Sequence, residues 1–171
     1  LDLQNCEQML TQFLPLYWAY WLHPMYTVTN ELQESLALWL KIMQREVHGY
    51  YLQQNGKLLT NFFLAQYVEN LYAGLLNSMQ YPESYTHDPD DEDDQQFDAH
   101  HFDISKAEVN LARIAKDQVK PLLIRSISEY IVSPLSTGLV PVQSLPAGPA
   151  QATLHMFFNY AEGANAAATK K

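Results

Sequence analysis

Acidic residues at alternate positions are the first feature of the sequence that could do chemistry. Asp88, Asp90 and Glu92 have the spacing with which an EF-hand loop begins to bind calcium. That loop also needs a glycine at its sixth position and a glutamate at its twelfth, where this chain has Asp93 and Ala99. The pattern therefore predicts a solvated acidic segment and no specific calcium site.

A second candidate metal site is the group Asp98, His100, His101 and Asp103. Zinc sites are typically marked by motifs such as Cys-x-x-Cys or His-Glu-x-x-His, and neither occurs in this chain. Adjacent side chains in an extended segment point in opposite directions, so both histidines would seldom bind one ion. We therefore predict solvated histidines and no bound metal.

Nucleophilic and cofactor chemistry have little support in the sequence. The chain has no Gly-x-Ser-x-Gly or Ser-x-x-Lys motif and no glycine-rich phosphate loop, since it contains only 6 glycines. Cys6 is the single cysteine and lies at an apolar helical position, where a thiol stays protonated and unreactive. These observations predict a protein that is not an enzyme and has no cofactor.

The negative charge has one source. The formal net charge is −9, and the segment 82–103 contains no Lys or Arg but holds nine of the 19 acidic residues. Phosphates would be repelled and no basic stripe is available, so nucleic acid is excluded as a partner. The densest acidic run could instead steer a partner with a basic surface, and consists of Asp90, Asp91, Glu92, Asp93 and Asp94.

A cluster of aromatic residues near the N-terminus is the most unusual apolar feature. Tyr17, Trp18, Tyr20, Trp21 and Tyr26 lie within ten residues and would cover most of the circumference of a helix. One interpretation is a corner of the core with tyrosine hydroxyls at the surface. The functional interpretation is an anchor for a partner, because Trp and Tyr dominate interface hot spots.

Apolar residues recur at steps of three and four, which predicts an all-α fold. Helices are expected over 2–14, 31–54 and 57–80, and the Asn55-Gly56 pair between the last two predicts an antiparallel hairpin. Ser105 and Glu108 form a capping box that predicts the start of a fourth helical segment, which Pro121 would kink or break. Together these elements predict a bundle-like domain of four or five helices.

Two regions are expected to lie outside the packed helices. Within a helical domain at residues 1–132, the acidic segment 82–103 lacks periodicity and predicts a long flexible loop. Residues 133–171 are rich in proline and glycine and predict an extended tail. A short docking segment at 153–160 contains Phe157 and Phe158, which we expect to contact a partner.

The function that these features favour is a non-enzymatic module that binds other proteins, such as an adaptor, a chaperone-like factor or a subunit of a larger hetero-complex. A helical bundle that binds an apolar small molecule or lipid is the alternative. A metal-assisted enzyme around His100 and His101 is the third hypothesis.

The sequence also favours a cytoplasmic protein. It has a single cysteine and no visible signal peptide. The longest apolar stretch, residues 13–22, is half the length of about 20 residues that a bilayer span needs and contains Pro15, so no transmembrane segment is predicted. Because the chain begins with Leu1 and not Met, we expect it to be a processed or trimmed form.

Overall fold

The described residues are helical wherever they have regular secondary structure. The computed structural model describes residues 12, 13, 15–23, 25–41, 44, 62–81, 85–136 and 147–168. Helices lie at residues 15–21 and 33–41 and in the elements α2 (Tyr26–Asn30), α4 (Phe62–Ser78), α5 (Glu92–Ile114), α6 (Lys116–Ile127), η1 (Ser128–Val132), α7 (Ser133–Ser136) and α8 (Ala147–Ala168). The prediction of an all-α fold is confirmed.

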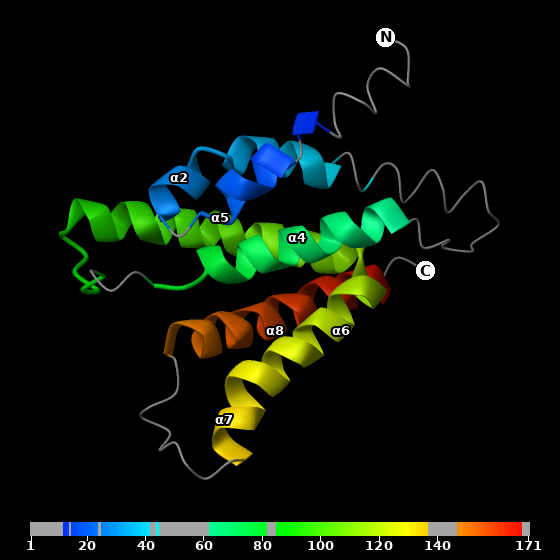
Figure 1. Cartoon of the computed structure of the whole chain (residues 1–171). Coiled ribbons are helices and arrows are strands. Elements are labelled where there is room, and N and C mark those ends of the chain that lie inside the picture. The colour runs from blue at the N-terminus through cyan, green and yellow to red at the C-terminus, as the bar shows by residue number, and fades with distance from the viewer. Residues whose placement is uncertain are drawn as a thin grey trace.

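Helix α5 is the centre of the molecule (Figure 1). Helices α4, α6 and α8 all contact it and one another, which gives the bundle-like array that the sequence predicts. Helix α8 runs parallel to α5, because His155 lies beside His101 and Asn159 lies beside Glu108. The helices at 15–21 and 33–41 lie across α5 from α8. The predicted hairpin turn at Asn55-Gly56 and most of the segment 2–14 lie outside the described residues.

The core is a continuous cluster of apolar side chains at helical spacing. Its fully buried members come from four helices and from the helix at 15–21, and include Trp21, Val68, Leu71, Leu75, Ile104, Leu111, Val119 and Met156. Trp21 packs directly on α4 at Gly74, where an added Cβ would overlap the indole ring. The glycine therefore lets a large aromatic side chain fill the space between two helices.

Helix α5 corrects the prediction for the acidic segment 82–103. That segment is not a long flexible loop, because the helix begins at Glu92. The Asp91 carboxylate accepts hydrogen bonds from the backbone N–H groups of Asp93 and Asp94, and acidic side chains in the first turn are favoured by the helix dipole. Ser105, the predicted helix start, lies in the interior of α5.

Helix α8 corrects the prediction of an extended tail at 133–171. Residues 133–136 form α7, and the predicted docking segment 153–160 lies inside a helix of 22 residues. Pro149 is the third residue of α8, where its missing N–H has no intrahelical partner to lose. The rest of the helix contains seven alanines, and because alanine is the strongest helix former, they outweigh the cost of its glycines.

The predicted break near Pro121 occurs earlier in the chain. Ala115 separates α5 from α6 with φ −128° and ψ 41°, and α6 then continues through Pro121. Pro121 is exposed, so its ring faces solvent and its missing hydrogen bond is tolerated in the second turn. Helix α6 runs on through the π-helical segment η1 into α7 without leaving helical backbone angles.

None of the helices in the described part of the chain combines the length and the apolar composition that a bilayer crossing requires.

Candidate protein-interaction surfaces

The N-terminal aromatic cluster divides between core and surface. Tyr17 and Trp21 are 3% and 0% exposed, so the prediction that they contact a partner is wrong. Trp18 is half-buried and packs edge-on against Tyr17, with ring centroids 5.0 Å apart. Tyr20 is 59% exposed and remains free for a partner, whereas the side chain of Tyr26 lies outside the described residues. The aromatic residues on the inner face of the helix at 15–21 are buried, and those on its outer face are exposed.

Phe157 and Phe158 lie on an exposed apolar surface of α8. Together with Leu154 they form the α8 stripe, whose three side chains are 58% (Leu154), 52% (Phe157) and 68% (Phe158) exposed. The steps of three and four between these positions place the three side chains on one side of the helix. The sequence therefore predicted the right residues for a surface position, although it placed them in an extended tail.

The face of α8 that packs on the bundle has smaller and more polar side chains than the α8 stripe. Its buried members are Ala152, Thr153, Met156, Asn159, Gly163 and Ala164. At Gly163 an added Cβ would overlap the backbone carbonyl oxygen of Val109, so α5 and α8 approach closely there. A surface helix of a globular protein normally turns its large apolar side chains inward, but in α8 Met156 is buried while Leu154, Phe157 and Phe158 are exposed.

A buried polar pair joins the inner face of α8 to α5. Glu108 is 0% exposed, and the side-chain amide of Asn159 donates a hydrogen bond to its Oε2. Its Oε1 has no hydrogen-bond partner in the described part of the chain. Burial raises the pKa of Glu108 to about 8, and the bond from Asn159 offsets only part of this increase. The carboxyl group is therefore protonated at neutral pH.

Neither residue of this pair was predicted as a site residue from the sequence. Glu108 was interpreted as half of a capping box, although it follows Ile104 by four positions and precedes Leu111 by three. Both of those neighbours are 0% exposed, so the helical spacing itself places Glu108 on the core side of α5. That spacing is the signal that could have identified it as a buried acid.

Four of the five acidic residues predicted to steer a partner are exposed. They are Asp90, Asp91, Glu92 and Asp93. Asp94 is 5% exposed and is occupied inside the protein, so its predicted role in steering is wrong. Its Oδ2 accepts hydrogen bonds from the backbone N–H groups of Thr86 (3.0 Å) and Asp88 (2.9 Å) and from the Thr86 hydroxyl (2.9 Å).

These bonds have two consequences for the loop before α5. Burial by itself would raise the pKa of Asp94, but the bonds from Asp88 and Thr86 outweigh it and lower the pKa below its ordinary value. They also bracket His87, which has a φ of 60°. A non-glycine residue in that region needs such external support. The loop is thus fixed on the N-terminal end of α5, and the exposed acids beside it have a defined position.

A cluster of stacked rings links this acidic end to α8. His101 stacks on Tyr81 with ring centroids 4.9 Å apart, and His155 of α8 meets His101 edge-on at 5.2 Å. Tyr85 contacts the same Tyr81 ring at 4.7 Å, and its hydroxyl donates a 2.6 Å hydrogen bond to Oδ1 of Asp98. The ring cluster therefore connects α8, at the residue after Leu154, to the part of α5 that carries Asp98.

The prediction of solvated histidines is wrong, because both His100 and His101 are buried, and the two rings face different neighbours. His100 Nδ1 lies 2.6 Å from Nε2 of Gln33, whereas His101 Nε2 lies 3.2 Å from the backbone carbonyl oxygen of Met79. Burial lowers the pKa of His100 to about 4, so its ring is neutral at physiological pH. Within the described ranges, no group of three or more His, Cys, Asp or Glu residues is arranged to hold a metal ion. Cys6 lies outside those ranges.

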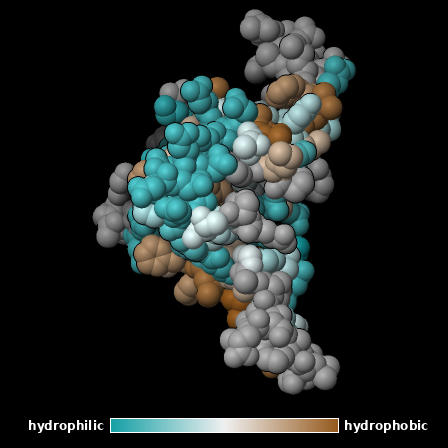
Figure 2. Space-filling model, turned by 90° about the vertical axis from the view of Figure 1, so that its left-hand side faces the viewer, coloured by the Kyte–Doolittle hydropathy of each residue, from teal (hydrophilic) through white to brown (hydrophobic). Residues whose placement is uncertain are grey.

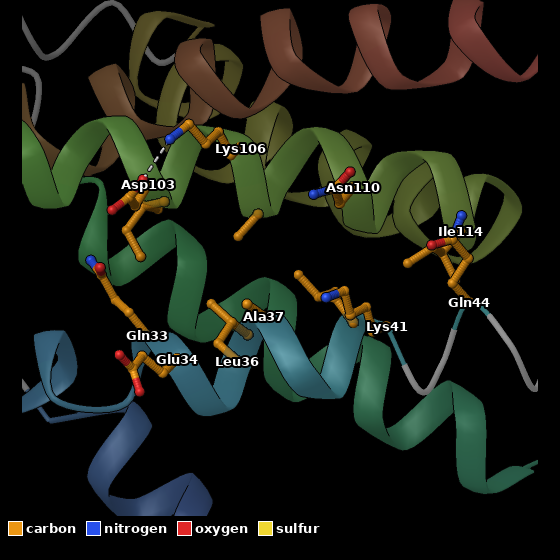
Figure 3. A pocket seen from close by; sticks show the side chains of 13 residues that line it. Gln33, Glu34, Leu36, Ala37, Lys41, Gln44, Asp103, Lys106, Asn110 and Ile114 are labelled. Carbon is orange, nitrogen blue, oxygen red and sulfur yellow. Dashed lines mark hydrogen bonds and ion pairs between the residues drawn. The ribbon is translucent and has the colours of Figure 1, made fainter.

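A groove of about 480 Å³ runs between the helix at 33–41 and α5 (Figure 3). Its apolar floor is closed, because Leu36, Leu40 and Ile104 are 3%, 5% and 0% exposed. Polar side chains from both helices line its edges, and include Gln33, Glu34, Lys41, Asp103, Lys106 and Asn110. Lys106 and Asp103 form a 2.8 Å ion pair on the rim. The groove therefore combines a largely apolar lining with polar side chains along its edges.

Comparison with known proteins yields no relative, since no protein-family model, no curated protein and no solved structure matches this chain. Its function has to be argued from its own surfaces.

Proposed function

We propose that this chain is a non-enzymatic interaction module, an adaptor or a subunit of a larger complex, that binds another protein through the α8 stripe. The observation that carries the proposal is the exposure of Leu154, Phe157 and Phe158, each of which leaves more than half of its surface in solvent. Burying an apolar side chain of this size contributes roughly 1.5–3 kcal/mol, so leaving three adjacent ones exposed forgoes substantial stabilisation. Contiguous exposed apolar surface marks interaction sites in soluble proteins.

The composition of the two faces of α8 supports this proposal. The helix buries Met156 among small and polar residues, and it exposes the three large apolar residues of the α8 stripe. The close contact at Gly163 and the buried bond between Glu108 and Asn159 hold the observed rotation. A partner that covers the α8 stripe would recover the burial that folding of this chain leaves incomplete.

A bundle that binds an apolar small molecule receives less support. The groove beside the helix at 33–41 has a suitable volume, since ligand pockets typically enclose about 300–1,000 Å³. Its floor residues Leu36, Leu40 and Ile104, however, are already covered by their own neighbours, and charged side chains stand along its edges. The groove is also open to solvent, so it would leave much of a ligand uncovered, whereas ligand pockets typically bury most of a ligand's surface.

We also propose that the protein is cytoplasmic, on the basis of its single cysteine.

A quantitative affinity capture tests the proposal. The full chain carrying a tag is compared with the variant Phe157→Ser/Phe158→Ser in extract of the source cells, and bound proteins are measured by mass spectrometry. Leu38→Ser is the matched control, because Leu38 is also an apolar helix residue and is 58% exposed. We expect a partner that the wild type and Leu38→Ser recover equally and that the double variant loses by about tenfold or more, equivalent to about 1.4 kcal/mol. Equal recovery of every protein by all three chains would contradict the proposal.

A further inference from the structure

We infer that the partner segment is a basic amphipathic helix, which lies along the α8 stripe with its Lys or Arg residues at the acidic end of the molecule. This inference rests on the proposed function and adds the chemistry of the partner. Two surfaces carry it, namely the α8 stripe and the exposed acids Asp88, Asp90, Glu92, Asp93 and Asp98, which together are called the acidic end.

The two surfaces are neighbours in the folded chain. The first turn of α8 lies on the end of α4, because a Cβ added at Gly148 would be 3.1 Å from Oε1 of Gln80. Further along α8, His155 meets His101 of α5 edge-on. Figure 2 shows hydrophilic surface over the loop and the N-terminal end of α5, and hydrophobic surface below it at the level of α8. A single partner segment can therefore contact both.

The charge on this side of the molecule has one sign. No Lys or Arg occurs anywhere between Lys57 and Lys106 in the sequence, so the acidic end has no basic residue of its own segment to neutralise it. Asp98 is the exposed acid linked most directly to α8, through Tyr85 and the ring cluster. At physiological salt such charges act over a Debye length of about 8 Å, so they would attract basic residues of a bound helix that extends from the α8 stripe toward the acidic end. The complementary partner is basic.

The form of the stripe favours a helical partner. Leu154, Phe157 and Phe158 make a ridge along the outside of α8, and ridges of this spacing pack into the grooves of another helix. An anionic membrane would also offer an apolar layer, but its surface charge has the same sign as the acidic end. The observations thus favour an amphipathic helix with basic flanks over a lipid surface.

Synthetic peptides test the inference on the full chain. The first probe is a helix-forming peptide of about 16 residues, or about four turns, with Leu on one face and Lys on the other. The second has Glu in place of Lys, and the third probe is a vesicle of anionic phospholipid. Binding is measured by fluorescence anisotropy or co-sedimentation at about 50 mM and about 300 mM salt.

We expect the Lys peptide to bind at least about tenfold more tightly than the Glu peptide at low salt, and the vesicles not to bind. The variant Phe157→Ser/Phe158→Ser should lose about tenfold for the Lys peptide, while Leu38→Ser should not. The variant Asp90→Asn/Glu92→Gln/Asp93→Asn should no longer prefer the Lys peptide over the Glu peptide, and its binding of the Lys peptide should no longer depend on salt. The control Glu129→Gln, which changes another exposed acid, should keep both properties. Asp91 and Asp94 stay unchanged because they hold the start of α5.

Three results would overturn the inference. If both peptides bind equally and through the phenylalanines, the proposed function stands but its partner is not basic. If the Lys peptide binds independently of the phenylalanines, or if the vesicles bind through them, the α8 stripe does not select a basic helix. If neither peptide binds, the inference fails, and the affinity capture separately decides the proposed function.

Discussion

Glu108 is the residue whose chemistry departs most from its ordinary behaviour. Its pKa is raised from 4.5 to about 8 by burial. Between these two pH values the folded protein keeps a proton that the unfolded chain releases, so the free energy of unfolding falls as the pH rises. Above about pH 8 both states are ionised and the effect levels off. The buried acid is therefore a cost to stability at neutral pH, about 3 kcal/mol at pH 7.

The variant Glu108→Gln should remove this cost. A glutamine keeps an oxygen for the amide of Asn159, but its own amide nitrogen would occupy the place of Oε1, where an unsatisfied donor costs about 1–2 kcal/mol. The net gain at about pH 7 is then about 1–2 kcal/mol, and the fall in stability between about pH 5 and about pH 8 should disappear. Urea unfolding at several pH values measures both. Glu162→Gln, on the exposed side of α8, is the control. Parallel pH profiles for Glu108→Gln and wild type would contradict the assignment.

His100 gives the opposite slope at lower pH. Its pKa is lowered from 6.5 to about 4 by burial, so the unfolded chain binds a proton in this interval that the folded protein does not. Stability is lost as the pH falls from about 6.5 toward 4. In Glu108→Gln, where the opposing effect is absent, we expect stability to rise steadily over this range, and His100→Gln in the same background should flatten that rise. If the free energy of unfolding still rises with pH to the same extent in the double variant, groups other than His100 cause the increase.

At the scale of elements, the sequence predicted helices well where apolar residues are spaced along one face and poorly where other signals compete. The acids before Phe97 were interpreted as disorder, but the same acids cap α5 and favour its dipole. Proline and glycine suggested an extended tail, yet Pro149 lies in the first turn of α8. For the candidate surface, the sequence identified Phe157 and Phe158, two residues of the α8 stripe. It could not identify the hydrogen bond between Glu108 and Asn159, because this bond joins residues 51 positions apart.

The close packing of α5 on α8 predicts that Gly163→Ala is destabilising. Alanine favours an isolated helix by about 1 kcal/mol over glycine, but here its Cβ would overlap the Val109 carbonyl oxygen and the side chain of Ala112. Because backbone cannot move aside easily, we expect a loss of about 1–3 kcal/mol in thermal or chemical unfolding. Gly148→Ala in the same helix meets only the flexible end of Gln80 and should be neutral or stabilising. Equal effects of the two substitutions would show that the helices are not in such close contact.

The N-cap of α5 makes a second prediction at this scale. Asp91→Ala removes the acceptor for the N–H groups of Asp93 and Asp94, which should cost about 1 kcal/mol and speed amide hydrogen exchange in the first turn. Asp90→Ala changes the same charge without removing this cap, so its first turn should stay protected. Equal exchange in both variants would mean that the acidic residues act by charge alone.

At the scale of the whole molecule, polar and apolar surfaces are separated in a way that folding alone does not require. The packed core is complete without the α8 stripe, because α4, α5, α6 and α8 already bury a continuous cluster. The side chains of the stripe are more than half exposed, and Figure 2 shows hydrophobic surface at the level of α8 below the hydrophilic surface at the N-terminal end of α5. This separation supports an interface that is held ready by a rigid scaffold.

Photo-crosslinking from position 158 tests this account most directly. A photoreactive amino acid replaces Phe158, and in a second chain it replaces the equally apolar Leu38, which is exposed on a different helix. After irradiation in source cells, we predict a discrete covalent adduct with one protein from position 158 and none from position 38. The absence of any adduct at position 158, or the same adducts from both positions, would contradict the claim that the α8 stripe is a protein-binding surface.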